Sequence, residues 1–135
     1  MKKKKILYVG AFLEDRSLLT HAIWPIHQEE KAEHVTLAFK PGDDHPALEL
    51  IGSETTVRVV GHSSDSKGQA ALVEVDVHCD NAHPHVTLSV AEGVAPSYSN
   101  QLLAVGEVTH IPPLSLRARI GARLTDGSIW YGEEA

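Results

Sequence analysis

The four-residue word His-Val-Thr-Leu occurs twice in this 135-residue chain, at positions 34–37 and 85–88, each time inside an apolar run. Recurrence of a whole word points to an internal repeat, since composition alone rarely produces it in so short a chain. Both runs have the length and the β-branched content of a strand. The chain is therefore expected to contain two equivalent strands that present the same side chains.

Strand geometry determines how each word presents its side chains, because successive residues point to opposite faces. His34 and Thr36 therefore share one face of the first strand, and His85 and Thr87 share one face of the second. The valine and leucine of each word point the other way, where burial against a core would fix the direction of the polar pair. Two such strands could line one cleft with two imidazoles and two hydroxyls.

Strand and helix signals alternate along the rest of the chain. Further strands are expected in residues 6–13, 55–60, 70–77, 105–111, 114–124 and 128–131. Short helices are expected from about residue 18 to just before Pro25, with Asp15 or Ser17 as the cap, and in residues 46–51 and 100–104. These patterns predict one mixed, mainly antiparallel α+β domain over residues 1–135.

Cysteine content and hydropathy indicate the cellular setting. The single cysteine, Cys79, excludes an intrachain disulfide framework. No run of about 20 apolar residues is present, and no segment resembles a secretory signal. The expectation is a cytoplasmic protein with no membrane partner.

The formal charge of −6, counted with neutral histidines, argues against a protein that grips long duplex nucleic acid by neutralising its phosphates. A small or terminal phosphate ligand is still compatible with this charge. The chain also carries nine histidines, which titrate near neutrality. A phosphate-bearing small molecule or RNA terminus is therefore the kind of partner that the composition allows.

Two imidazoles suit a reaction that removes a proton from a nucleophile and gives one to a leaving group. Histidine titrates near pH 6.5, so its neutral and protonated forms are both accessible near neutrality. Phosphodiester cleavage has this double demand, and the hydroxyls of Thr36 and Thr87 could donate hydrogen bonds to the phosphate oxygens. The scheme requires no metal ion or other cofactor.

Two His-x-Thr-hydrophobic motifs on strands of a small domain resemble the signature of the 2H phosphoesterase superfamily. The short separation of the motifs and the run at residues 99–103 most resemble the cyclic phosphodiesterase domain of fungal-type tRNA ligases. The resemblance implies a bilobal fold in which two mainly antiparallel sheets flank a central cleft, with short helices outside.

The same resemblance implies an activity for the two motifs. It is the metal-independent hydrolysis of a 2′,3′-cyclic phosphate, on an RNA end or a nucleotide, usually to a 2′-phosphate during RNA processing or repair. His34 and His85 would then be the general acid and base, in an order that the sequence leaves open. Thr36 and Thr87 would hold the phosphate.

Further substrate contacts are expected near the motifs. Ser89 shares a predicted strand face with His85 and could contact the phosphate. Tyr8 could stack on a base, and Tyr98 and Asn100 lie after the second motif, where a base or ribose could bind.

Two alternatives to an enzyme remain open at this stage. The same cleft could hold an RNA end or a phosphorylated ligand without turnover. Less favoured is a histidine-rich metal-binding protein that uses His78, Cys79, His83 and His85, because their spacing matches no standard metal motif.

Overall fold

The computed structural model describes residues 5–132, in which strands predominate. The strands are β1 (Ile6–Leu13), β2 (Glu29–Glu30), β3 (His34–Phe39), β4 (Glu54–Ser64), β5 (Gly68–Val75), β6 (His85–Val90), β7 (Thr109–Leu124) and β8 (Ile129–Trp130). The helices are α1 (Arg16–Ala22), the 3-10 helix η1 (Pro46–Leu50) and α2 (Tyr98–Val105). Both repeated words lie in strands, β3 and β6, as the sequence predicts.

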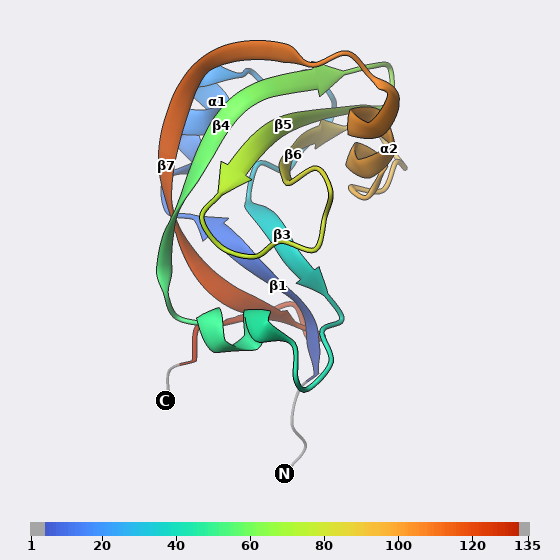
Figure 1. The fold of residues 1–135 in the computed structure, drawn as a ribbon. Coiled ribbons are helices and arrows are strands. Elements are labelled where there is room, and N and C mark those ends of the chain that lie inside the picture. The colour runs from blue at the N-terminus through green and yellow to red at the C-terminus, as the bar shows by residue number, and fades with distance from the viewer. Residues whose placement is uncertain (1–4, 133–135) are drawn as a thin grey trace.

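Six strands close into one antiparallel barrel in the order β1-β3-β6-β5-β4-β7, and β7 pairs back onto β1 (Figure 1). The two-residue strands β2 and β8 add to β6 and β7 respectively. The expected bilobal α+β fold with two sheets flanking a central cleft is therefore wrong. The helices lie outside the barrel wall, as Figure 1 shows for α1 and α2.

The long strand β7 explains the difference from the expected fold. Its first part pairs with β4, and its last part, Ala118–Leu124, pairs with β1, so it connects the two edges of the sheet β1-β3-β6-β5-β4 and closes it into a barrel. Pro112 and Pro113 lie in β7 where the pairing with β4 shifts register, and such an irregularity tolerates proline, which has no N–H to donate. Because of these prolines, the sequence predicts two strands, 105–111 and 114–124, where the structure has the single strand β7. The closure of the barrel was missed for a different reason: alternation reveals the buried face of a strand but not its neighbours.

The barrel interior holds the aliphatic residues of both words. Val35, Leu37, Val86 and Leu88 are all fully buried in the main core cluster. Burial of such side chains contributes about 1.5–3 kcal/mol each to the free energy of folding. Their burial turns the histidine and threonine of each word to the outer face of the barrel wall, as strand alternation predicts.

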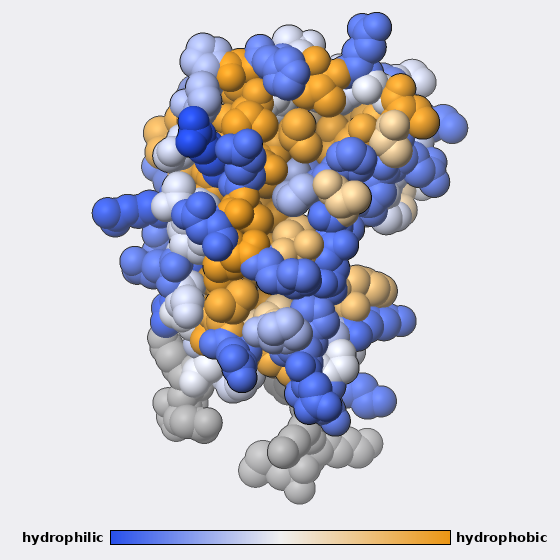
Figure 2. All heavy atoms as spheres, in the orientation of Figure 1, coloured by the Kyte–Doolittle hydropathy of each residue, from blue (hydrophilic) through white to orange (hydrophobic). Residues whose placement is uncertain are grey.

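Asp15 caps α1 as expected, because its carboxylate accepts a hydrogen bond of 3.1 Å from the Ser17 N–H. α2 starts at Tyr98, and the side chain of Ser97 makes no capping hydrogen bond. None of the helices in residues 5–132 has the length and apolar character needed to span a membrane. On the face drawn in Figure 2, hydrophobic residues run down the middle over the strands, with hydrophilic residues along both sides.

Candidate active site

The two words are neighbours in the barrel wall. β3 and β6 are antiparallel, and Val35 lies opposite Val86. One residue to either side of this pair, the antiparallel register sets His34 opposite Thr87 and Thr36 opposite His85. Each histidine therefore faces the threonine of the other motif, in a local twofold arrangement.

The flanking strands extend this local symmetry. On β1, Gly10, Ala11 and Phe12 pair with Thr36, Val35 and His34; on β5, Ala70, Ala71 and Leu72 pair with Thr87, Val86 and His85. Both ladders shift register at the equivalent step, just before Gly10 and just before Ala70. The internal repeat therefore includes the neighbouring strand of each motif.

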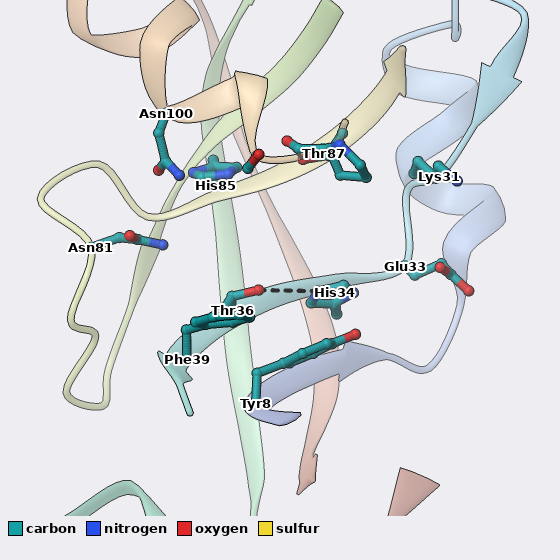
Figure 3. Close-up of a pocket in the computed structure, with 12 residues that line it drawn as sticks. Tyr8, Lys31, Glu33, His34, Thr36, Phe39, Asn81, His85, Thr87 and Asn100 are labelled. Carbon is teal, nitrogen blue, oxygen red and sulfur yellow. Dashed lines mark hydrogen bonds between the residues drawn. The ribbon is translucent and has the colours of Figure 1, made fainter. Parts of the chain in front are cut away.

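The four motif side chains line one pocket of about 540 Å³ on the outer face of the wall (Figure 3). Tyr8 and Asn100, expected to contact substrate, also line it. The sequence analysis missed several other lining residues: Lys31, Glu33, Phe39, Asn81 and Pro96. The central expectation, that both histidines face one cavity, agrees with this placement.

His85 is oriented by the backbone. It is 8 % exposed, and its Nδ1 lies 2.8 Å from the His83 carbonyl oxygen, so Nδ1–H donates and Nε2 carries the lone pair. Burial lowers the pKa of His85, although the His83 carbonyl partly opposes this effect. The resting imidazole is therefore neutral and can accept a proton at Nε2.

His34 has different surroundings. Its ring stacks on Tyr8 with centroids 4.8 Å apart, and its Nε2 lies 3.1 Å from the Thr36 hydroxyl. Its Nδ1 is buried without a hydrogen-bond partner. Burial, with smaller contributions from the positive charge of Arg123 and from His85, lowers the pKa of His34 to about 4. A protonated His34 would hold a buried N–H without an acceptor, so its imidazolium is more acidic than an ordinary one.

Arg123 of β7 is a site residue that the sequence analysis missed. Its Nε donates to the Tyr8 hydroxyl at 3.2 Å, and its Nη1 donates to the Gly127 carbonyl at 2.8 Å. Tyr8 and Arg123 are direct partners in the β1–β7 pairing that closes the barrel. Arg123 comes near His34 only through the pairing of β1 with β7, and the sequence pattern does not reveal that pairing.

The second-motif threonine contacts the segment before α2 and the first turn of α2. The Thr87 hydroxyl lies 3.2 Å from the Pro96 carbonyl oxygen and 2.8 Å from the Ser99 hydroxyl. The corresponding hydroxyl of Thr36 contacts His34 instead. The two motifs therefore share a register but differ in their surroundings, and this difference can give the two histidines different roles.

Two weaker candidates lie outside the pocket lining. Ser89 is fully buried, where it donates to the Gln69 side chain at 2.7 Å and accepts from the His27 backbone at 3.1 Å. It belongs to a buried hydrogen-bond network. The Tyr98 hydroxyl donates to the Asp65 carboxylate, which pins α2 to the β4–β5 connection.

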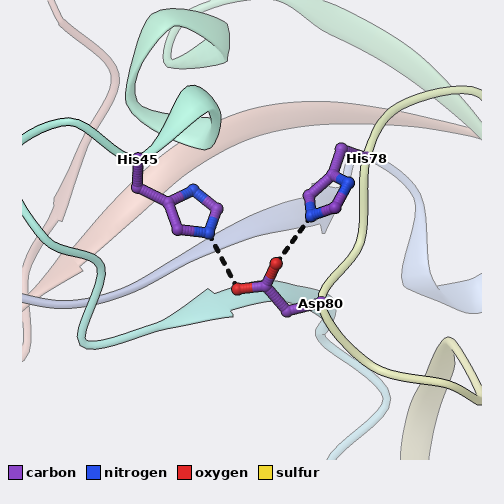
Figure 4. A group of neighbouring side chains, drawn as sticks. All are labelled: His45, His78 and Asp80. Carbon is purple, nitrogen blue, oxygen red and sulfur yellow. Dashed lines mark hydrogen bonds and ion pairs between the residues drawn. The ribbon is translucent and has the colours of Figure 1, made fainter.

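The residues considered for a metal are not gathered into one group. Within residues 5–132, the cluster with metal-binding side chains is instead His45, His78 and Asp80 (Figure 4). The Asp80 carboxylate accepts from His45 Nε2 at 2.8 Å and from His78 Nε2 at 2.6 Å.

His45 already uses both ring nitrogens. Its Nδ1 accepts the Ala47 N–H at 3.0 Å and caps η1, so its proton lies on Nε2. A metal bound at Nε2 would use the lone pair of that nitrogen, so the ring proton would have to move to Nδ1. There it would point at the Ala47 N–H. The cluster is therefore a hydrogen-bonded clasp, here called the Asp80 clasp, between the segment before η1 and the β5–β6 loop.

Comparisons with known proteins add no name to this geometry: no protein-family model matches the chain, and no curated protein matches it significantly. The functional argument therefore rests on the pocket itself. Two imidazoles with different hydrogen-bond partners and two hydroxyls surround one cavity, an arrangement that can bind a phosphate and move protons on two sides of it.

Proposed function

We propose that the protein is a metal-independent phosphodiesterase of the 2H type, which hydrolyses a 2′,3′-cyclic phosphate on an RNA end or a nucleotide to a 2′-phosphate. The observation that carries this proposal is the Val35–Val86 pairing. It sets each histidine opposite the threonine of the other motif, and all four side chains line one pocket. A cytoplasmic role in RNA processing or repair is part of the same proposal.

In this mechanism the phosphate lies in the pocket, over the outer faces of β3 and β6. The hydroxyls of Thr36 and Thr87 donate hydrogen bonds to its non-bridging oxygens, which carry the negative charge. In the structure the Thr36 hydroxyl contacts the His34 ring, and the Thr87 hydroxyl contacts the Pro96 carbonyl and the Ser99 hydroxyl, so the phosphate would exchange with these partners. In-line attack and departure require that the two imidazoles act from two sides of the phosphorus.

We assign His85 as the general base and His34 as the general acid. His85 Nε2 takes a proton from water as the water oxygen bonds to phosphorus. The bond from phosphorus to O3′ breaks, and protonated His34 gives its Nε2 proton to O3′, which leaves a 2′-phosphate and a 3′-hydroxyl. The bound phosphate anion favours the imidazolium of His34 and so offsets the effect of Arg123.

Steady-state kinetics in EDTA with 2′,3′-cyclic nucleotides tests the proposal. His34→Ala and His85→Ala should each lower kcat by about 10²–10⁴-fold. Thr36→Ala and Thr87→Ala should lower kcat/KM less, since each removes one neutral hydrogen bond. His110→Ala, on an exposed residue of β7, is the matched control and should leave the rate unchanged.

Full activity in both histidine variants would contradict the proposal, as would absence of turnover by the wild-type protein. In the second case, tight binding of the cyclic phosphate without product would indicate a binding module for an RNA end or a phosphate ligand.

A further inference from the structure

A pocket that binds phosphate is expected to contain a positive charge, and the two histidines do not supply one at rest. Burial lowers the pKa of both His34 and His85, so both rings are neutral at rest. Of the lining residues within the described part of the chain, Lys31 alone is a lysine or arginine. Lys31 is therefore the permanent cation of a pocket proposed to bind phosphate.

The backbone around Lys31 is anchored to the second motif and to α1. The N–H of Lys31 donates to the Leu88 carbonyl at 2.8 Å, and the N–H of Ala32 donates to the Thr87 carbonyl at 2.7 Å. Arg16 of α1 donates from Nε to the Ala32 carbonyl at 3.0 Å and from Nη2 to the Lys31 carbonyl at 2.5 Å. Four hydrogen bonds therefore fix the point from which the lysine side chain extends.

Ala32, in the turn between β2 and β3, has an unfavourable backbone conformation. It is fully buried and has a φ of 53°, in the left-handed region that residues with a Cβ rarely adopt. Such strain persists only where surrounding contacts enforce it, and it is frequent at functional sites. The contacts from Arg16, Thr87 and Leu88 provide this enforcement.

Lys31 lies at one end of the pocket and not at its centre. Figure 3 shows Lys31 and Glu33 beyond Thr87, on the side away from Asn81 and Asn100. The Lys31 side chain is 36 % exposed, and its Nζ lies 3.9 Å from a partly exposed carboxylate of Glu29. An exposed ion pair of this kind is weak, so the ammonium can exchange it for a phosphate.

We propose that Lys31 binds a second phosphate, the next one along an RNA strand, so that the preferred substrate is an oligonucleotide end and not a free cyclic mononucleotide. This inference rests on the proposed function, which places the reacting phosphate among the four motif side chains. The ammonium at the rim then meets the phosphodiester that joins the terminal nucleotide to its neighbour.

The test compares adenosine 2′,3′-cyclic phosphate with the dinucleotide ApA that ends in a 2′,3′-cyclic phosphate. The wild-type protein should prefer the dinucleotide, and raised salt should reduce this preference. Lys31→Met should lower kcat/KM for the dinucleotide by about tenfold or more and change the mononucleotide value by less than about twofold. Lys31→Arg should keep most of the preference.

Lys5→Met is the matched control, because Lys5 precedes β1 and does not line the pocket. Thermal unfolding of each variant separates a folding defect from a binding defect. An equal decrease of kcat/KM on both substrates in Lys31→Met would overturn the inference, since Lys31 would then hold the reacting phosphate. Equal wild-type rates on both substrates would overturn it as well.

Turnover of neither substrate would overturn the proposed function instead. Calorimetric titration with the dinucleotide would then decide the role of Lys31 separately. Weaker binding by Lys31→Met than by Lys5→Met would support the second-phosphate contact, and equal binding would overturn it.

Discussion

Val35 of β3 lies directly opposite Val86 of β6, and this register brings the two His-x-Thr motifs together. Because side chains alternate, the buried valines fix the outward direction of the residues on either side. A shift of one residue would turn a histidine and a threonine of one strand into the core. The valine pair is thus a structural determinant of a polar site in which it takes no chemical part.

The acid and base roles can be separated with a substrate whose leaving group needs no proton. Replacement of O3′ by sulfur makes the leaving group a thiolate, which departs unprotonated. His34→Ala should then recover most of its lost rate on this substrate relative to the wild-type protein, because His34 donates the proton. His85→Ala should stay slow on both substrates. Recovery by His85→Ala in place of His34→Ala would reverse the assignment.

The pH profile of kcat/KM should have an acidic optimum. The proposed mechanism requires protonated His34 and neutral His85, and burial lowers both pKa values below the ordinary value of about 6.5. Both limbs of the bell-shaped profile should therefore lie below pH 6.5, and one of them should lie near pH 4, where the pKa of His34 lies. An optimum at pH 7 or above would contradict this account of the two environments.

Arg123 should control the protonation of His34. Its positive charge helps to lower the pKa of His34, so Arg123→Met should raise that pKa. NMR titration of the histidine ring protons measures this shift directly. Arg58→Met, at an exposed site of β4, should leave the His34 titration unchanged. An unchanged His34 titration in Arg123→Met would show that burial alone sets the value.

Folding stability should decrease in acid through the same histidine. Between pH 6.5 and 4 the unfolded chain binds a proton at position 34 and the folded protein does not, so the free energy of unfolding falls as pH falls. The full contribution, present above pH 6.5, is up to about 3 kcal/mol. Urea unfolding between these pH values should show a shallower pH dependence for His34→Gln than for the wild-type protein, whereas His110→Gln should keep the wild-type slope.

The Asp80 clasp should position the β5–β6 loop for substrate binding. Asp80 joins His45 to His78, its N–H donates to the Leu37 carbonyl, and the next residue, Asn81, lines the pocket. Asp80→Ala should raise KM more than it lowers kcat, and the stability loss should be at most about 1 kcal/mol because the group is half exposed. Asp76→Ala, at an exposed site at the start of the same loop, is the control. Equal effects of both variants on KM would argue against a positioning role.

The sequence predicts the motif strands well because the information is local. The word His-Val-Thr-Leu contains its own alternation, and burial of Val35 and Val86 follows from it. Tyr8 lies in the pocket because β1 pairs with β3, a pairing that alternation on β1 alone does not reveal. Ser89 shows the limit of this reasoning, because the loop that carries His27 covers its strand face and buries it.

The closed barrel and the charged site residues depend on contacts that are distant in sequence. Arg123 reaches Tyr8 only because β7 pairs with β1 across more than a hundred residues. Lys31 reaches the pocket through a turn that Arg16 holds in an unfavourable backbone conformation. Neither relationship leaves a periodic signal in the sequence, so the strand positions of the two motif histidines could be predicted but not the charges that surround them.

The central claim is that both histidines act on one cyclic phosphate without a metal. The most direct measurement is phosphorus NMR of adenosine 2′,3′-cyclic phosphate incubated with the wild-type protein in EDTA. The account predicts conversion to adenosine 2′-phosphate, with loss of this conversion in His85→Ala and in His34→Ala. Absence of conversion by the wild-type protein, or unchanged conversion by either variant, would contradict it.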